Sequence, residues 1–97
     1  MYDYHDATFT TLSIEWESGT TVLSFKLSPE TVEQMRLVVS GTSLLEFKRE
    51  FPWGKSVSVN HLKVSTAGPG EQRVEVEMQS GDQIIVVGSE VLEKLAD

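Results

Sequence analysis

The sequence contains no cysteine, and it has no long apolar segment. Without cysteine the chain cannot form a disulfide, a thiolate zinc site or a cysteine nucleophile, so nothing indicates an oxidising compartment and we expect the cytoplasm. The first six residues are polar and acidic, and no apolar run approaches membrane-spanning length. We therefore expect neither export through a cleaved leader nor insertion into a membrane.

Basic residues are also scarce, with 8 Lys and Arg against 15 Asp and Glu and a formal net charge of −7. Residues 1–25 carry four acids and no base, and residues 76–97 carry five acids and one base. Nucleic acids and anionic membranes are bound through Lys and Arg, so this distribution disfavours both as partners. A basic protein partner remains compatible with the charge, and so does a role in solubility alone.

The rest of the composition is typical of one globular domain. The 97 residues are 39% hydrophobic and 24% charged, which is enough to build one core without a metal or a disulfide. We find no linker, repeat or low-complexity segment. The sequence therefore predicts a single domain over residues 1–97, with no cofactor.

Alternation of apolar and polar residues is the main structural signal. In residues 11–17 it places Leu12, Ile14 and Trp16 on one face, which predicts a half-buried strand with Trp16 in the core. Residues 21–27 repeat the pattern after a glycine at position 19, and the two segments are predicted to form a hairpin.

The next segments continue this pattern with one interruption. Ser28-Pro29-Glu30 predicts the start of a short helix, because serine caps a helix and proline suits its first position. Alternation resumes over residues 35–39 and again over 43–48, with Gly41 between them. This arrangement predicts a second hairpin.

The C-terminal half contains three more segments of regular structure. Alternation changes phase at Asn60-His61, which predicts a β-bulge, and residues 73–79 and 84–87 are predicted strands joined by a tight turn. Residues 84–87 are all apolar, which predicts burial on both faces. The spacing of apolar residues in Ser89 to Leu95 predicts a short helix.

Together these segments predict a mainly β fold. Its strands are short, and turns recur every 8 to 12 residues. We expect an antiparallel sandwich or an open barrel of six to seven short strands, with a short C-terminal helix.

The two histidines are the first candidates for a binding or metal site. His5-Asp6 resembles a metal-binding dipeptide, but His61 is the only other histidine, and a metal site would need more ligands. The alternative is that His5 and Asp6 fix the start of the first strand through hydrogen bonds. His61 lies beside the predicted bulge, where a side chain is either aimed at a site or simply hydrogen bonded.

Catalytic signatures are otherwise missing from the sequence. No serine lies in a nucleophile elbow, and the Glu15/Glu17 and Glu75/Glu77 pairs alternate with core residues, which predicts solvent exposure. Gly68-Pro69-Gly70 is followed by no Lys-Ser/Thr and predicts a turn. We therefore expect a protein that is not an enzyme.

Aromatic side chains offer a better case for binding. Trp53 lies between Pro52 and Gly54 in a predicted loop, where it either projects as an anchor or closes one end of the core. Tyr2 and Tyr4 lie in a polar terminus and are candidates for exposure.

Three segments carry a resemblance to a known group of proteins. They are the opening His5-Asp6-Ala7, the Pro52-Trp53-Gly54 followed by Ser56-Val57-Ser58-Val59, and residues 78–84. Together they resemble small β-rich bacterial domains, some of which look like immunity proteins of polymorphic toxin systems. The resemblance implies a bacterial protein-binding domain and assigns no functional residue.

The sequence therefore favours a non-catalytic protein-binding module with an acidic surface, in its most concrete form an immunity-like protein that meets a basic toxin. One alternative is a structural or assembly subunit that pairs an edge strand with a copy of itself. Another is a small-ligand-binding β-domain that uses Trp53. An enzyme built on His5, Asp6 and His61 is the least favoured hypothesis.

Overall fold

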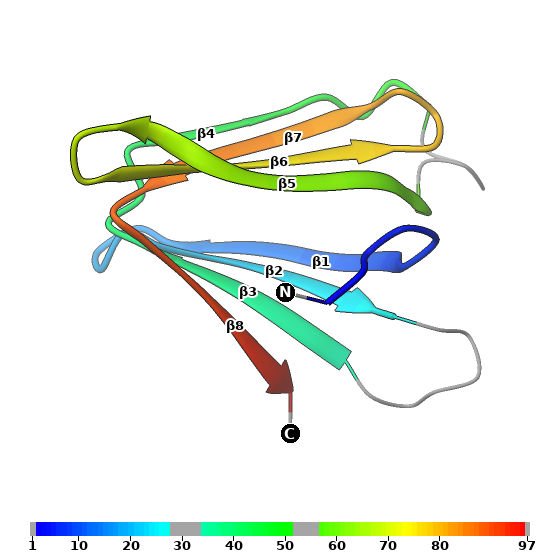
Figure 1. The fold of residues 1–97 in the computed structure, drawn as a ribbon, viewed down its shortest axis with the longest axis horizontal. Coiled ribbons are helices and arrows are strands. Elements are labelled where there is room, and N and C mark those ends of the chain that lie inside the picture. The colour runs from blue at the N-terminus through cyan, green and yellow to red at the C-terminus, as the bar shows by residue number, and fades with distance from the viewer. Residues whose placement is uncertain (1, 28–33, 52–56, 97) are drawn as a thin grey trace.

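The chain folds into two antiparallel β-sheets. A computed structural model describes residues 2–27, 34–51 and 57–96. These residues form eight strands and no helix, and the sheets lie in two layers (Figure 1). The strands are β1 (Thr8–Glu15), β2 (Thr20–Lys26), β3 (Gln34–Ser40), β4 (Leu44–Phe47), β5 (Val59–Gly68), β6 (Glu71–Met78), β7 (Gln83–Gly88) and β8 (Glu90–Ala96).

Each sheet has four strands, in the orders β1-β2-β3-β8 and β4-β7-β6-β5. The predicted first hairpin is confirmed as β1 and β2, whose turn has Gly19 at φ 68°. The strands predicted over 73–79 and 84–87 are confirmed as β6 and β7. The predicted mainly β fold is thus correct, and the described residues contain eight strands where we expected six or seven.

The core lies between the two sheets and draws on alternate residues of their inner strands. Burial of these apolar side chains supplies the main driving force for the two layers to pack. Phe25 is fully buried and contacts Tyr4 edge to face, with ring centroids 4.9 Å apart. The buried hydrophobic residues are Tyr4, Ala7, Leu23, Phe25, Met35, Leu37, Val39, Val59, Val74, Val76, Met78, Ile84, Val86 and Val87.

The predicted β-bulge is confirmed. The pairing of β5 with β6 shifts register between Val59 and His61, so Asn60 is the extra residue.

The predicted burial of residues 84–87 also holds for three of the four, since Ile84, Val86 and Val87 are buried and Ile85 is half-buried. β7 lies between β4 and β6, so side chains of both neighbouring strands flank its residues.

The predicted C-terminal helix over Ser89 to Leu95 is wrong, because this segment is strand β8. Ser89, expected to cap the helix, instead donates its backbone N–H to the carbonyl of Ser40, at 2.8 Å. Val91 then pairs with Val39 at the free edge of β3. Hydrogen bonding along a whole strand edge outweighs the weak helical preference of a short segment.

The predicted second hairpin is also wrong. The two segments form β3 and β4, which belong to different sheets. Gly41, at φ 61°, turns the chain from one layer to the other, and Thr42 donates its N–H to the carbonyl of Gly19. β4 then pairs with β7.

Trp16 is not a core residue, contrary to the prediction. Its side chain is 88% exposed, and that of Ile14 is 41% exposed. The pairing of β1 with β2 ends at Glu15 and Thr20, so Trp16 lies in the turn, where strand alternation no longer sets the direction of a side chain.

Two predictions fall on residues outside the described part of the chain. These are the helix start at Ser28-Pro29-Glu30 and the loop that carries Trp53. Within the described ranges, the structure contains no helix of the length and apolarity required to cross a membrane.

Candidate functional site

The N-terminal segment, residues 2–7, binds to the start of β5. The N–H of Asp6 donates to the carbonyl of Val59 at 2.8 Å, and the N–H of Val59 donates to the carbonyl of Ala7 at 2.8 Å. Because β5 belongs to the other sheet, these bonds join the two layers. We call residues 2–7 the N-terminal strap.

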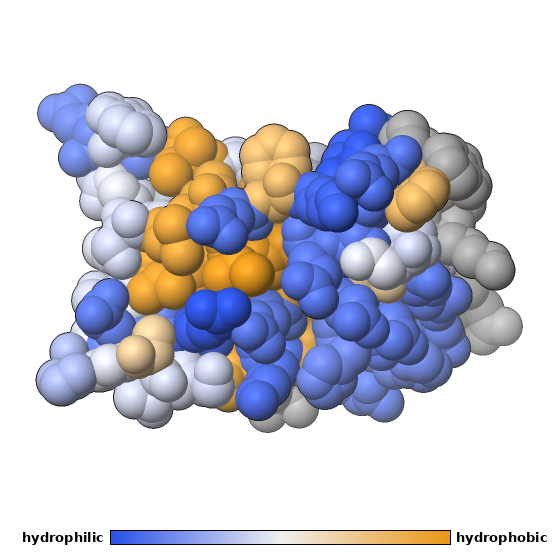
Figure 2. Space-filling model, turned by 90° about the horizontal axis from the view of Figure 1, so that it is seen from above, coloured by the Kyte–Doolittle hydropathy of each residue, from blue (hydrophilic) through white to orange (hydrophobic). Residues whose placement is uncertain are grey.

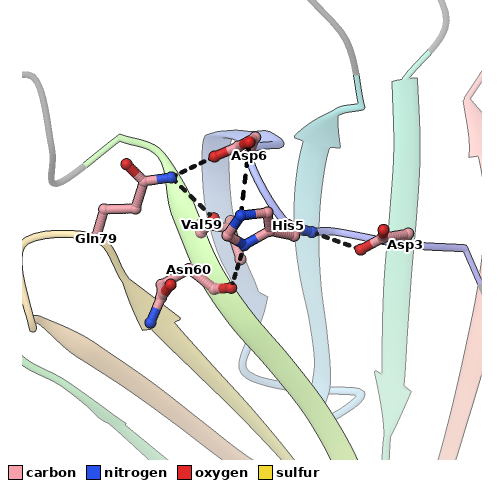
Figure 3. Close-up of polar contacts among 6 residues, drawn as sticks. All are labelled: Asp3, His5, Asp6, Val59, Asn60 and Gln79. Carbon is pink, nitrogen blue, oxygen red and sulfur yellow. Dashed lines mark hydrogen bonds and ion pairs between the residues drawn. The ribbon is translucent and has the colours of Figure 1, made fainter.

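The predicted site residues His5 and Asp6 lie within this strap and hold it in place (Figure 3). His5 Nδ1 lies 2.8 Å from the carbonyl oxygen of Asn60, the bulged residue. Gln79 donates its side-chain N–H to the carboxylate of Asp6. The structure therefore agrees with the hydrogen-bonding interpretation of His5-Asp6.

The electrostatics of His5 fit this role. The hydrogen bond to the Asn60 carbonyl raises the pKa of His5 above its usual value, and the nearby carboxylates of Asp6 and Asp3 act in the same direction. His5 Nε2 lies 3.6 Å from Asp6 Oδ2, and both side chains are more than half exposed. Protonation of His5 would therefore strengthen a surface contact.

His61 does not join this cluster. It follows the bulge and is exposed, and its cross-strand partner is Glu77. Among the residues that the structure describes, no group of three or more His, Cys, Asp or Glu side chains is placed to hold a metal ion. Trp53, the fourth predicted binding residue, lies outside the described ranges.

The strap also closes one side of the molecule, through Tyr4. This residue is 3% exposed, and its hydroxyl donates a 2.6 Å hydrogen bond to Glu93 on β8. The backbone N–H of Tyr2 donates to the same carboxylate at 3.0 Å. Burial and then the neighbouring Glu93 raise the pKa of Tyr4 above its usual value. The strap thus contacts both β5 and β8.

A groove lies on the other side of the molecule, between the edge strands β1 and β4. Its volume is about 340 Å³. Met78 and Ile84, both buried, form its floor, while Phe47 is 62% exposed at its rim. The described residues that line it are Phe9, Thr10, Thr11, Leu12, Phe47, Lys48, Arg49, Val57, Met78, Asp82 and Ile84.

The shortness of β4 explains why this side is exposed. β4 has four residues, of which Leu45 and Phe47 face the core side because they pair with Val86 and Ile84. No further strand of the described residues pairs with the outer edge of β4. The apolar face of this strand therefore remains partly in solvent.

Asp82 builds one end of the groove. Its carboxylate accepts the backbone N–H groups of Glu50 at 3.0 Å and Phe51 at 3.1 Å, and the residue is 2% exposed. These bonds fix the chain that follows β4, and so they position Lys48 and Arg49 at the groove. The sequence alone identifies Asp82 only as part of a turn, because the N–H groups that it accepts belong to residues 31 and 32 positions earlier in the chain.

Exposed apolar side chains are concentrated on this side. Of the nine large hydrophobic residues that are exposed in the described part of the chain, six belong to β1, β4 or the segments next to them, namely Ile14, Trp16, Leu44, Phe47, Phe51 and Val57. The other three are Tyr2, Leu92 and Leu95. We call the first six residues, with the groove, the β1/β4 face.

The outer surface of the β4-β7-β6-β5 sheet adjoins this face. Figure 2 shows it from above, with an apolar area bordered by hydrophilic side chains. The strand register places Leu44, Ile85 and Val87 on this surface. Glu46 and Glu75 are the cross-strand partners of Ile85 on the two neighbouring strands. Apolar groups ringed by charge are typical of surfaces that bind proteins.

No family model, no curated protein and no solved structure matches this chain. A proposal for its function therefore rests on its own residues.

Proposed function

We propose that this chain is a non-catalytic protein-binding module that contacts its partner through the β1/β4 face. The observation that carries this proposal is Trp16, a tryptophan 88% exposed at the tip of a hairpin. Tryptophan is among the residues most enriched at the energetic centres of protein interfaces. Burial of so large an apolar side chain against a partner would be favourable.

The groove supports the same proposal. Phe47 and Val57, at its rim, are 62% and 46% exposed, and its floor is apolar. A volume of about 340 Å³ accommodates one or two apolar side chains of a partner. Binding of this kind would cover the incompletely buried face of β4.

The charge around Trp16 favours a basic partner. Trp16 is flanked by Glu15 and Glu17, and all three are exposed. The whole chain carries a net charge of −7. Carboxylates around an apolar anchor steer and select a positively charged surface. The most concrete form of this function is an immunity-like protein that neutralises a basic toxin in the cytoplasm of a bacterium.

The chemistry of the groove supports a non-catalytic role. Asp82 is the one acidic residue among the described residues that line it, and its two carboxylate oxygens accept backbone N–H groups. No histidine is found among these described lining residues. General acid-base chemistry needs a titratable group free to exchange a proton with a substrate.

Capture from the source cells tests the proposal. The full chain is immobilised, partners are collected at low salt and identified, and the affinity of the purified pair is measured. We expect Trp16→Ala to weaken binding by ~10-fold or more and added salt to weaken it further. Tyr2→Ala is the matched control, because Tyr2 is an exposed aromatic residue on the strap. Equal affinities of the Trp16→Ala, Tyr2→Ala and unmodified chains would overturn the proposal.

The groove also favours a second candidate, a domain that binds a small ligand. Its volume lies at the lower end of the range for ligand pockets, and its apolar floor is bordered by Lys48 and Arg49. A thermal-shift screen of sugars, nucleotides and apolar carboxylates tests this function. A rise in Tm that Phe47→Ala abolishes would support it, and the absence of any rise would exclude these ligands.

A further inference from the structure

We propose that β8 pairs with β8 of a second copy of this chain, antiparallel and centred on Leu92, to form a symmetric dimer. β8 is a seven-residue edge strand that pairs with β3 on one side. No strand of the described residues pairs with its other side. An edge of this length offers a row of backbone donors and acceptors to a further strand.

Glu90 and Lys94 lie at equal distances on either side of Leu92 and carry opposite charges. Val91 and Glu93 pair with the buried Val39 and Leu37 of β3, so Glu90, Leu92 and Lys94 point to the outer surface of the sheet. In an antiparallel pair centred on Leu92, Glu90 of each copy faces Lys94 of the other. The dimer therefore gains two cross-strand pairs of opposite charge, which stabilise a sheet.

Within one chain these charges are poorly matched. Lys94 is the cross-strand partner of Arg36, so two cations lie side by side. Among the described residues the ion pairs are His5–Asp6, Lys48–Glu50 and Arg73–Glu75, none of which involves Arg36, Lys94 or Glu90. Like charges that face each other across two strands are destabilising. The acid supplied by a second copy would offset this repulsion.

Apolar contacts favour the same register. Val22, Val38 and Leu92 form a row across the outer surface of the sheet, and Leu92 is 44% exposed. In the proposed dimer the two Leu92 side chains meet, and the row continues into the second copy. A pairing centred one residue away, on Val91 or Glu93, would place Leu92 opposite a charge and leave the acid and the base unmatched.

The symmetry identifies the occupant as a copy of this chain. In a dimer with a two-fold axis, β8 meets its own copy running in the opposite direction. A strand with an acid and a base at equal distances from its centre is complementary to such a copy. This surface is distinct from the β1/β4 face, and the inference does not depend on the proposed function.

Light scattering over a range of concentrations, combined with charge exchange, tests the inference. We expect the unmodified chain to have twice the mass of one chain at high concentration. Lys94→Glu and Glu90→Lys should each weaken dimerisation roughly 10-fold or more, because each places two like-charge pairs at the interface. The double exchange Glu90→Lys/Lys94→Glu should restore the dimer.

A stability measurement separates loss of the dimer from loss of folding. Lys94→Glu places an acid beside Arg36. At low concentration, where both chains are monomers, this variant should therefore unfold at a temperature equal to or above that of the unmodified chain. A monomer at every concentration up to ~1 mM for the unmodified chain would overturn the inference. Undiminished dimerisation of the folded single variants, or failure of the folded double variant to dimerise, would also overturn it.

Discussion

The hydroxyl of Tyr4 donates a 2.6 Å hydrogen bond to the carboxylate of Glu93, which joins two residues 89 positions apart in the chain. This contact ties the N-terminal strap to β8, while His5 and Asp6 tie the strap to β5. The strap therefore covers the gap between the two sheets on this side, and it reaches β8 through the side chain of Glu93 and not through the backbone edge of the strand. The opposite side, between β1 and β4, retains a groove and most of the exposed apolar residues.

Tyr4→Phe is expected to lower the free energy of unfolding by about 1 to 2 kcal/mol. The substitution keeps the ring against Phe25 and removes the donor to a half-buried carboxylate, and hydrogen bonds to charged groups are worth more than neutral ones. Urea unfolding measures the change. Tyr2→Phe is the control, since Tyr2 is 52% exposed. Equal stabilities of the two variants would contradict a role for the Tyr4 hydroxyl.

The same hydroxyl predicts a loss of stability in alkali. Burial and Glu93 raise the pKa of Tyr4 above its usual value of 10.0, so the folded chain keeps a proton that the unfolded chain releases. The stabilisation is complete below pH ~10 and is lost as the pH rises towards the folded pKa. The stability difference between the unmodified chain and Tyr4→Phe should therefore shrink above pH ~10. A constant difference up to pH ~11.5 would contradict this linkage.

Asp6 has a left-handed backbone conformation, with φ 66°, and it also accepts a hydrogen bond from Gln79. Asparagine tolerates this conformation and keeps an acceptor oxygen, whereas alanine does neither. We expect Asp6→Ala to lower the free energy of unfolding by about 1 to 2 kcal/mol and Asp6→Asn to change it by less than about 0.5 kcal/mol. Equal losses in the two variants, measured by urea unfolding, would contradict this account.

Gly88 lies where β7 passes close to the chain that leaves β3. A Cβ at this position would lie 2.5 Å from Cγ1 of Val39 and 2.6 Å from the carbonyl oxygen of Ser40. Gly88→Ala should therefore destabilise the fold by about 1 to 3 kcal/mol, as overpacking does. Gly68→Ala is the control, because the nearest atom to its Cβ is a side-chain oxygen of Glu71 at 3.4 Å. A milder effect at Gly88 than at Gly68 would show that this contact is not tight.

Much of the fold follows from the sequence because strands have a two-residue period. That period identified the first hairpin, the pair β6 and β7, and the bulge at Asn60. It failed at Trp16, which lies beyond the last paired residue of β1. It also failed for β8, because the apolar residues at 91, 92 and 95 fit a helical stripe better than the two-residue period of a strand.

The candidate site was less accessible to sequence reasoning. The hydrogen-bonding role of His5 and Asp6 was foreseen as an alternative, but their partners Asn60 and Gln79, which lie 55 and 73 residues further along the chain, were not. The groove was not foreseen, because it depends on which strands lie at the sheet edges. A glycine-containing turn is compatible either with a hairpin or with a change of sheet. At Gly41 the chain changes sheet.

The most direct test of the proposed binding face is an amide chemical-shift map of the labelled chain titrated with its captured, purified partner. We expect the shifts to concentrate in residues 9–17 and 44–51 and the amides of β5 to change little. Shifts confined to β5 or to the N-terminal strap would contradict it.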